Sequence, residues 1–300
     1  MYELVIVGAG PAGMTAAVYA ARKMIDTLVV SKDVGGQVAI SSMIENYVGF
    51  QFITGPELTK KFEEHMEHFN LEVKEGEEVK KIDRRSDGFN IITDLNSYES
   101  KAVIVASGRK PRRLNVLGED ELIGRGLAYC ATCDAPLFGG KDVAVVGGGN
   151  SGFEAVLQLM KIASKVYLIE LSSELRGDPI MLEKIKANKN VTIMTNTRTK
   201  EILGEQMVQG LKIKREGKDE VLKLQGVFVE IGWLPSSDFI GIAEKNDFNE
   251  ILVNERCETS VPGLFAAGDV TCVPEKQIII AAGEGAKAAL SAFNFLSRKE

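Results

Sequence analysis

One pattern occurs twice in this chain, and it restricts the possible folds more than any other feature of the sequence. Residues 4–7 form an apolar run that leads into a glycine-rich turn at 8–13, and residues 143–146 lead in the same way into a turn at 147–152. Each run predicts a buried strand, and an Ala-rich or apolar-striped helix follows each turn. Two such units predict an α/β protein with two Rossmann-like, dinucleotide-binding domains.

Both turns have the spacing Gly-x-Gly-x-x-Gly, and each glycine has its own physical role. The first permits the tight turn, the second lets the backbone approach a pyrophosphate, and the third lets helix and strand pack closely. The N-terminus of the following helix then offers free N–H groups to the phosphates. These roles belong to Gly8, Gly10 and Gly13 in the first turn, where Pro11 suits the first helical position, and to Gly147, Gly149 and Gly152 in the second. Two dinucleotide sites in one chain indicate electron transfer between two cofactors.

The end of the second strand in each unit distinguishes the two sites. In the second unit the strand at 165–169 ends in Glu170. A carboxylate there accepts hydrogen bonds from both ribose hydroxyls and repels a 2′-phosphate. The same offset in the first unit falls on Ser31, although Asp33 is near. The alternative for Glu170 is an ordinary exposed acid at the end of a strand.

The order of the remaining segments indicates how the domains are arranged. Residues 109–121 are charged, contain Pro and Gly, and suggest a connection that leaves the first domain; residues 233–235 suggest a second crossing. A strand and glycine turn at 264–269 and a helix at 283–296 follow. The sequence therefore predicts a nucleotide domain interrupted by a second one, with the first domain in residues 1–112 and 236–300 and the inserted domain in residues 113–235.

Composition excludes several classes of function. The chain has 300 residues, 45% of them hydrophobic, and a formal net charge of −6. A mildly acidic protein is poorly suited to nucleic acid phosphates or an anionic membrane. No signal-peptide pattern precedes the first strand, and no apolar run approaches the roughly 18 residues of a membrane span. We therefore expect a cytoplasmic protein.

The pair Cys130 and Cys133 calls for a chemical explanation. Two intervening residues let the sulfurs form a small reactive disulfide and lower the pKa of a thiol. One sulfur can take electrons from inside the protein while the other attacks an outside disulfide. Asp134, directly after the pair, could move the proton that dithiol chemistry requires.

A metal site is the alternative use of such a pair, and the sequence argues against it. A structural zinc site needs four ligands, and neither Cys257 nor Cys272 begins a second pair. His65 and His68 lie three residues apart on the predicted helix 57–69, but no third ligand is apparent. We therefore expect no metal, an ordinary solvated face for the two histidines, and two unremarkable thiols.

From end to end, the chain resembles the low-molecular-weight thioredoxin reductases. The second half is most similar to the flavoprotein component of alkyl hydroperoxide reductase. That component carries extra N-terminal thioredoxin-like domains, whereas the first nucleotide strand here begins at residue 4, so a separate acceptor protein is expected. The segments that carry the first resemblance are 8–13, 35–37, 45–47, 130–134, 147–152 and 262–269, and those that carry the second are 149–155, 257–261, 276–281 and 283–288.

The resemblance implies a homodimer that binds FAD in the first domain and NAD(P)H in the inserted domain. It places Cys133 on the flavin side, gives Cys130 the attack on the partner disulfide, and makes Asp134 the acid/base. The expected acceptor is a thioredoxin, a glutaredoxin-like protein or a member of a peroxiredoxin system. The FAD residues implied are Gly8, Gly10, Pro11, Ala12, Gly13, Gly35, Gly36, Gln37, Asn46, Val79, Ala106, Gly108, Gly268, Asp269, Gln277 and Ile278; the nicotinamide residues are Gly147, Gly149, Asn150, Ser151, Gly152, Glu170, Ile231 and Gly232.

One departure from the family bears on the electron donor. NADPH-dependent thioredoxin reductases have a basic cluster after the second nucleotide strand. Here residues 170–176 keep only Arg176 of that cluster, and Glu170 stands where the family has histidine. Both lines of reasoning predict NADH over NADPH. A smaller departure is Ala135, where the family usually has glycine.

Two other functions remain open from the sequence. Some flavin-dependent thioredoxin reductases resemble this chain but take electrons from ferredoxin; the intact turn at 147–152 argues against that alternative. A nucleotide-binding module without turnover is the second, and the complete cysteine pair argues against it. In the family, the nicotinamide domain rotates relative to the FAD domain, which makes residues 109–114 and 231–236 the hinge candidates.

Overall fold

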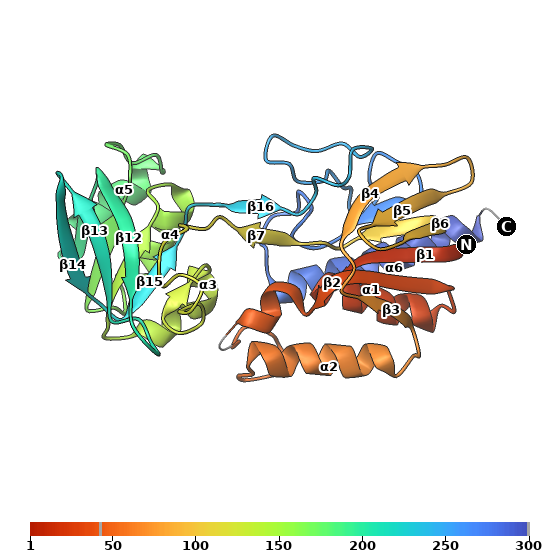
Figure 1. Ribbon diagram of the computed structural model, residues 1–300, viewed down its shortest axis with the longest axis horizontal. Coiled ribbons are helices and arrows are strands. Elements are labelled where there is room, and N and C mark those ends of the chain that lie inside the picture. The colour runs from red at the N-terminus through yellow and green to blue at the C-terminus, as the bar shows by residue number, and fades with distance from the viewer. Residues whose placement is uncertain (42–43, 299–300) are drawn as a thin grey trace. The chain divides into compact units, whose positions relative to one another are not determined.

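The computed structural model describes residues 1–41 and 44–298. The chain divides into two compact units, one of Met1–Lys110 with Leu234–Glu300 and the other of Pro111–Trp233 (Figure 1). Each unit is described by itself below.

A single sheet forms the centre of the first unit. Within the described residues its strand order is β3-β2-β1-β6-β5-β4, and β17 pairs with β6. Strands β1, β2, β3, β6 and β17 are parallel, whereas β4, β5 and β6 pair antiparallel. The strands are β1 (Tyr2–Ala9), β2 (Thr27–Val34), β3 (Glu72–Glu75), β4 (Val79–Arg84), β5 (Phe89–Thr93), β6 (Ser97–Val105) and β17 (Leu264–Ala266).

The apolar run of β1 is continuous because both faces of the sheet are buried. Leu4 and Ile6 lie in one hydrophobic core with α1 and α6, while Val5 and Val7 lie in the core on the opposite face. Strands covered on both sides lose the alternation of polar and apolar residues. The helical elements of this unit are α1 (Pro11–Arg22), η1 (Gly36–Ile40), α2 (Gly55–Glu67) and α6 (Ile278–Ser297).

Helix ends in this unit follow local chemistry. Thr54 and Glu57 form a reciprocal capping box at the start of α2. Helix α6 begins five residues before the predicted start, because the apolar residues 278–282 continue the helix that we expected only from Gly283. Gly285 lets α6 approach α1 closely, since a Cβ there would lie 2.0 Å from the carbonyl oxygen of Ala12.

The second unit repeats the parallel strand–turn–helix design. Its main sheet has the order β11-β10-β9-β15-β8, with every pair parallel, and an antiparallel three-stranded sheet accompanies it. The strands are β8 (Leu127–Ala128), β9 (Asp142–Val146), β10 (Lys165–Ile169), β11 (Val191–Met194), β12 (Thr197–Leu203), β13 (Gly210–Arg215), β14 (Lys218–Lys223) and β15 (Gly226–Val229). The helical elements are α3 (Ala131–Asp134), η2 (Ala135–Phe138), α4 (Asn150–Leu159) and α5 (Pro179–Ala187).

The chain crosses between the units twice, through β7 (Arg109–Pro111) and β16 (Trp233–Pro235), which pair as a two-stranded sheet. Both crossings lie inside the segments that we named as hinge candidates. Among the residues that the structure describes, no helix has the length and apolar character needed to cross a membrane.

Candidate active site

The first glycine turn has the geometry of a phosphate cradle. Gly10 is the N-cap of α1, and no side chain hydrogen-bonds to the first turn of that helix. A Cβ on Gly10 would meet nothing within 4 Å, whereas a Cβ on Gly13 would lie 1.8 Å from the oxygen of Gly8. Gly13 therefore serves packing, while Gly10 faces open space beside the free N–H groups of a helix. A pyrophosphate fits this arrangement.

The second turn reproduces the first. Gly149 is the N-cap of α4, again without a side-chain cap, and a Cβ there would meet nothing within 4 Å. A Cβ on Gly152 would lie 1.9 Å from the oxygen of Gly147. Asn150 uses its Oδ1 to accept a hydrogen bond from the backbone N–H of Asp178 at 2.8 Å, so it also holds the segment before α5. The second cradle therefore fits a second dinucleotide.

Alanine substitutions separate packing from binding in this turn. We expect Gly149→Ala to fold like the wild type, within about 0.5 kcal/mol, but to bind its nicotinamide dinucleotide at least ~10-fold more weakly because the new Cβ obstructs the pyrophosphate. Gly152→Ala should destabilise the unit by about 3 kcal/mol or more, since its Cβ overlaps the Gly147 carbonyl. Urea unfolding and dinucleotide titration measure both effects. Equal stability of the two variants would contradict this assignment.

Equivalent acceptors lie within β2, which continues past the predicted strand end to Val34, and directly after β10. Ser31 Oγ accepts a hydrogen bond from the N–H of Ala9 at 3.0 Å, and Glu170 Oε2 accepts one from Gly148 at 2.7 Å. Ala9 and Gly148 occupy the same position in the two turns. Serine and glutamate thus stand at matching places, as the offset predicted, and only the second unit has a carboxylate there.

Glu170 is held firmly in the ionised form. Its Oε1 accepts hydrogen bonds from Ser172 through the backbone N–H at 2.7 Å and the hydroxyl at 2.8 Å. Burial opposes ionisation, but these hydrogen bonds, the one from Gly148 and the nearby Arg176 together lower the pKa of Glu170. The site therefore presents a fixed negative charge beside the second glycine turn.

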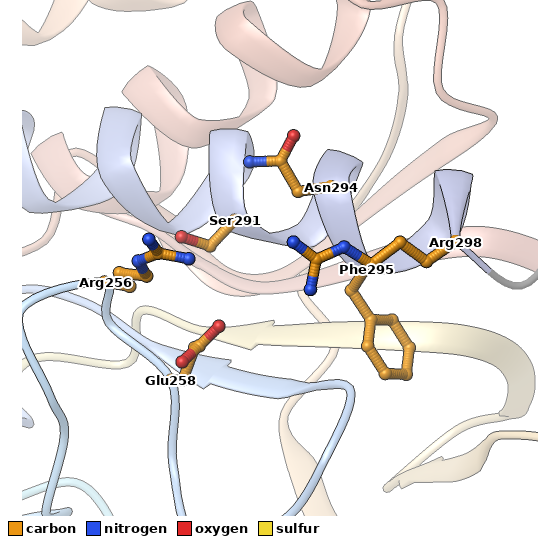
Figure 2. Close-up of a pocket in the computed structure, with 6 residues that line it drawn as sticks. All are labelled: Arg256, Glu258, Ser291, Asn294, Phe295 and Arg298. Carbon is orange, nitrogen blue, oxygen red and sulfur yellow. The ribbon is translucent and has the colours of Figure 1, made fainter.

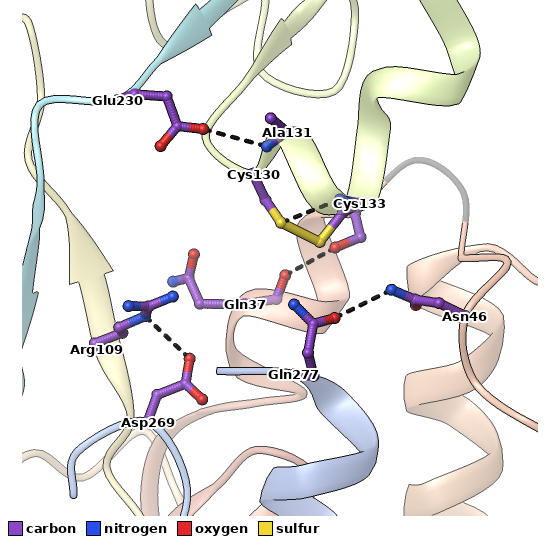
Figure 3. The surroundings of a disulfide bond; sticks show 10 residues. Gln37, Asn46, Arg109, Cys130, Ala131, Cys133, Glu230, Asp269 and Gln277 are labelled. Carbon is purple, nitrogen blue, oxygen red and sulfur yellow. Dashed lines mark hydrogen bonds and ion pairs between the residues drawn. A yellow bond between two sulfur atoms is a disulfide. The ribbon is translucent and has the colours of Figure 1, made fainter. Parts of the chain in front are cut away.

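Several predicted FAD residues gather at the carboxyl edge of the first sheet. Ala106 and Gly108 follow β6, and Gly268 and Asp269 follow its neighbour β17. The carboxyl ends of parallel strands form the binding edge of such sheets. The ion pair of Asp269 Oδ2 with Arg109 Nε, at 3.2 Å, lies at this edge (Figure 3). Burial raises the pKa of Asp269, although Arg109 and Lys276 act against the shift.

The other predicted FAD residues lie on three further segments. Gly36 opens η1, and a Cβ on it would lie 3.6 Å from the Cα of Gly10. Asn46 Nδ2 donates a hydrogen bond to Gln277 Oε1 at 3.1 Å, just before Ile278 opens α6 (Figure 3). Gly35 and Gln37 flank Gly36, and Pro11 and Ala12 begin α1.

Like Ala12 and Ala106, Val79 has its side chain in a hydrophobic core. It begins β4 and packs in the same hydrophobic core as Val5 and Val7. The segment before it lies beside the end of β2, because the N–H of Glu77 donates to the oxygen of Ser31 at 3.2 Å. The backbone of Glu77 is therefore held beside Ser31.

The cysteine pair forms a disulfide in the second unit. Cys130 and Cys133 are bonded, with their Cα atoms 5.3 Å apart. Cys130 is the N-cap of α3, and its Sγ accepts a hydrogen bond from the N–H of Cys133 at 3.2 Å (Figure 3). Cys257 and Cys272 are free thiols. Burial raises the pKa of Asp134, directly after the pair, to about 6.

Glu230 is a contact of this pair that the sequence analysis missed. Its Oε1 accepts a hydrogen bond from the N–H of Ala131 at 3.2 Å (Figure 3). It follows β15 and directly precedes Ile231 and Gly232, two of the predicted nicotinamide residues. Since β15 pairs in parallel with β8, the cysteine segment and the end of β15 meet at one sheet edge. The redox pair and the second dinucleotide turn thus share that edge.

A separate polar pocket of about 160 Å³ lies on the first unit, near the C-terminal end of α6 (Figure 2). Gln277 and Ile278 lie at the opposite end of that helix, roughly 20 Å away at 1.5 Å per residue. The residues that line the pocket are Arg256, Glu258, Ser291, Asn294, Phe295 and Arg298.

Among the described residues, no group of three or more His, Cys, Asp or Glu side chains could hold a metal ion.

Known proteins that are similar to this chain belong to one family of redox enzymes. Residues 2–287 match the pyridine nucleotide-disulphide oxidoreductase family. The F subunit of alkyl hydroperoxide reductase in Pseudomonas putida is 45% identical over 306 residues, covering 99% of this chain and 58% of that protein. NADH dehydrogenase of Bacillus subtilis is 43% identical over 301 residues, covering 99% and 59%. The chain therefore spans a little over half the length of these curated relatives.

Solved structures agree with this placement and with the predicted fold class. Thioredoxin reductase from Streptococcus pyogenes superimposes with a TM-score of 0.94 at 36% identity, with 99% of each chain covered. That from Giardia duodenalis gives 0.91 at 33% identity, again with 99% of each chain covered. The α/β fold with two dinucleotide-binding domains, and the resemblance inferred from the sequence, are confirmed. This chain belongs to the pyridine nucleotide-disulphide oxidoreductase family, which implies FAD and a nicotinamide cofactor.

Proposed function

We propose that this protein transfers electrons from NADH, through FAD, to the Cys130–Cys133 disulfide and then to a disulfide of another protein. The observation that carries the proposal is the position of the disulfide. Cys130 and Cys133 lie at the carboxyl edge of the sheet that bears the Gly147–Gly152 turn. The N–H of Ala131, between the two cysteines, donates a hydrogen bond to Glu230, which lies beside that turn. Steady-state reduction of a panel of disulfide proteins with NADH and with NADPH tests it.

Within this scheme the first unit holds FAD and the second holds NADH. When bound, FAD supplies the two-electron chemistry that links a hydride donor to a disulfide. The Gly8–Gly13 turn and the edge at Gly268 and Asp269 would hold the flavin, and Gly147–Gly152 with Glu170 would hold the nicotinamide dinucleotide. The crossings at 109–114 and 231–236 are proposed as hinges, and the working protein is proposed to be a homodimer.

The two cysteines have different proposed roles. Cys133 receives the electron pair on the flavin side, and the S–S bond breaks to leave two thiols. Cys130 then attacks one sulfur of the acceptor disulfide, and Cys133 resolves the mixed disulfide, so that the protein disulfide re-forms and the acceptor leaves as a dithiol. Asp134 exchanges the proton that these steps require.

NADH is proposed as the donor because Glu170 is fixed and ionised where a 2′-phosphate would lie. The name of the Bacillus subtilis relative supports the same donor. A related solved structure is titled a ferredoxin-flavin thioredoxin reductase, from Clostridium acetobutylicum. The open cradle at Gly149 and the charge of Glu170 favour a pyridine nucleotide over ferredoxin in this chain.

The acceptor is proposed to be a thioredoxin, a glutaredoxin-like protein or a peroxiredoxin-system protein. The relatives named for alkyl hydroperoxide reductase and the neighbours named thioredoxin reductase support this class. We infer a reducing compartment, the cytoplasm, since Cys257 and Cys272 are free thiols.

Asp134 gives a testable pH dependence of stability. Its pKa is raised from 3.8 to about 6. Between these pH values the folded protein therefore binds more protons than the unfolded chain. The contribution of Asp134 to the free energy of unfolding is consequently lost as pH rises through about 6. We expect Asp134→Asn to be more stable than the wild type by about 1–3 kcal/mol at pH 7 and by about one third of that at pH 4.5. Urea unfolding at the two pH values measures the difference.

The same substitution should impair the reaction. Without a titrating group beside the pair, Asp134→Asn is expected to reduce acceptor disulfides about 100-fold more slowly, while NADH reduces the flavin at the normal rate. If Asp134→Asn is more stable but less active, the Asp134 carboxylate destabilises the fold and serves the reaction. Unchanged acceptor turnover would remove Asp134 from the mechanism.

A further inference from the structure

Helix α6 carries one buried carboxylate that the reaction scheme does not use. Glu284 is 4% exposed, and its neighbours on the helix, Ala282, Gly283 and Gly285, are small residues suited to close packing. Placing a carboxylate in such surroundings is unfavourable unless it makes specific hydrogen bonds. Its contacts therefore indicate why it is there.

Those contacts close the turn that follows β17. Glu284 Oε2 accepts a hydrogen bond from the N–H of Gly268 at 2.7 Å and lies 3.4 Å from the hydroxyl oxygen of Thr271. The Thr271 hydroxyl also donates to the oxygen of Gly268 at 2.9 Å, and its N–H does so at 3.0 Å. The other oxygen, Oε1, is buried and has no hydrogen-bond partner among the described residues. Glu284 thus fastens α6 to the turn 268–271.

That turn is where the predicted flavin ligands converge. It contains Asp269, which pairs with Arg109. Gly268 has a φ of +77°, and a Cβ on it would lie 3.0 Å from the Cβ of Ala12, in the first turn of α1. One side chain therefore fixes the segment at which Asp269 and the N-terminus of α1 come together.

Two ammonium groups and one thiol lie near Glu284. Burial raises its pKa, while the hydrogen bond from Gly268, the ammonium groups of Lys276 and Lys287 and the Thr271 hydroxyl act against the shift. Cys257 donates from Sγ to the backbone oxygen of Glu284 at 3.6 Å, and burial raises the pKa of that thiol to about 11, so it stays neutral. Two carboxylates of this region therefore have raised pKa values, Glu284 on α6 and Asp269 in the turn that it holds.

We propose that Glu284 is a positioning residue for FAD: Glu284 holds the turn 268–271 so that Asp269 faces the cofactor, and its protonation weakens the retention of FAD. The inference rests on the proposed function, because it takes FAD as the ligand of this turn. It adds a residue that does not touch the reacting atoms but sets the geometry of one that contacts the cofactor.

Titration of the full-length apo-protein with FAD, followed by flavin fluorescence between pH 5 and 8, tests the proposal. At pH 8 we expect Glu284→Ala to raise the Kd for FAD about 10-fold, because the buried N–H of Gly268 loses its acceptor, and Glu284→Gln to raise it only about 3-fold, because the amide oxygen replaces that acceptor. The wild-type Kd should rise toward that of Glu284→Gln as pH falls, whereas Glu284→Gln should show only the weaker dependence that Asp269 contributes.

Glu255→Gln is the matched control, since the same chemical change there affects an exposed carboxylate. It should bind FAD like the wild type at every pH. Should Glu284→Ala not fold, the comparison of Glu284→Gln with the wild type still decides. Parallel pH profiles for those two proteins would overturn the inference, and a wild type that binds no FAD at all would overturn the proposed function itself.

Discussion

Replacing Cys133 by serine will abolish reduction of acceptor disulfides, by ~1,000-fold or more, while leaving reduction of the flavin by NADH at its normal rate. In the proposed scheme the disulfide is the last electron carrier within the protein, so its loss blocks transfer to the acceptor but not reduction of the flavin. Stopped-flow flavin absorbance and a coupled acceptor assay measure the two halves separately. Cys130→Ser should behave in the same way in both assays.

Cys272→Ser is the control for thiol removal as such, because Cys272 is a free cysteine outside the pair. It should retain full acceptor reduction. Normal acceptor reduction by Cys133→Ser would refute the scheme.

The two single variants also distinguish the roles of the cysteines. The remaining thiol in Cys133→Ser is Cys130, which should attack an acceptor whose cysteine is activated as a mixed disulfide with thionitrobenzoate. The coloured thiolate would be released as the two proteins become covalently linked. Cys130→Ser should react at least ~10-fold more slowly, since the proposed scheme places its remaining thiol, Cys133, on the flavin side. The reverse order of rates would exchange the two assignments.

Neutralising Glu170 will move the coenzyme preference toward NADPH. Glu170→Gln keeps an acceptor oxygen for Gly148 or Ser172 but removes the charge that repels a 2′-phosphate. We expect the ratio of kcat/KM for NADPH to that for NADH to rise about 10- to 100-fold. Because the pKa of Glu170 is lowered, its charge should be constant from pH 6 to 8, and any change of the wild-type ratio in that range should come from the 2′-phosphate of NADPH, whose second pKa is about 6.

Glu174→Gln is the matched control for that experiment, since it makes the same change on an exposed carboxylate of the same loop. It should leave the coenzyme ratio within about 2-fold of the wild type. A ratio that Glu170→Gln leaves unchanged, or a wild type that prefers NADPH, would contradict the role given to Glu170.

The elements predicted best were those determined by local sequence. The apolar runs at 4–7 and 143–146 and the turns that follow them require buried parallel strands and close helix packing wherever they occur. The matching positions of Ser31 and Glu170 followed from counting along the chain, because equivalent units place equivalent residues at the same sheet edge.

What the sequence did not reveal depends on contacts between distant segments. Glu230 meets Ala131 only because β15 and β8 pair, and the two-residue strand β8 has no recognisable pattern. Glu284 lies in a run of small residues that predicts simple packing, and its partner Gly268 belongs to the turn that follows β17. Parallel pairing at a common carboxyl edge could have indicated Glu230; no local signal could have indicated Glu284.

An anaerobic titration of the FAD-loaded protein with NADH tests the central claim most directly. Flavin and disulfide each accept two electrons, so we expect full reduction to consume about two equivalents of NADH per chain and to expose about two new thiols, which a thiol reagent counts. The double variant with serine at 130 and 133 should consume about one equivalent and expose none. A wild-type protein that stops at one equivalent without new thiols would show that the disulfide is not in electronic contact with the flavin.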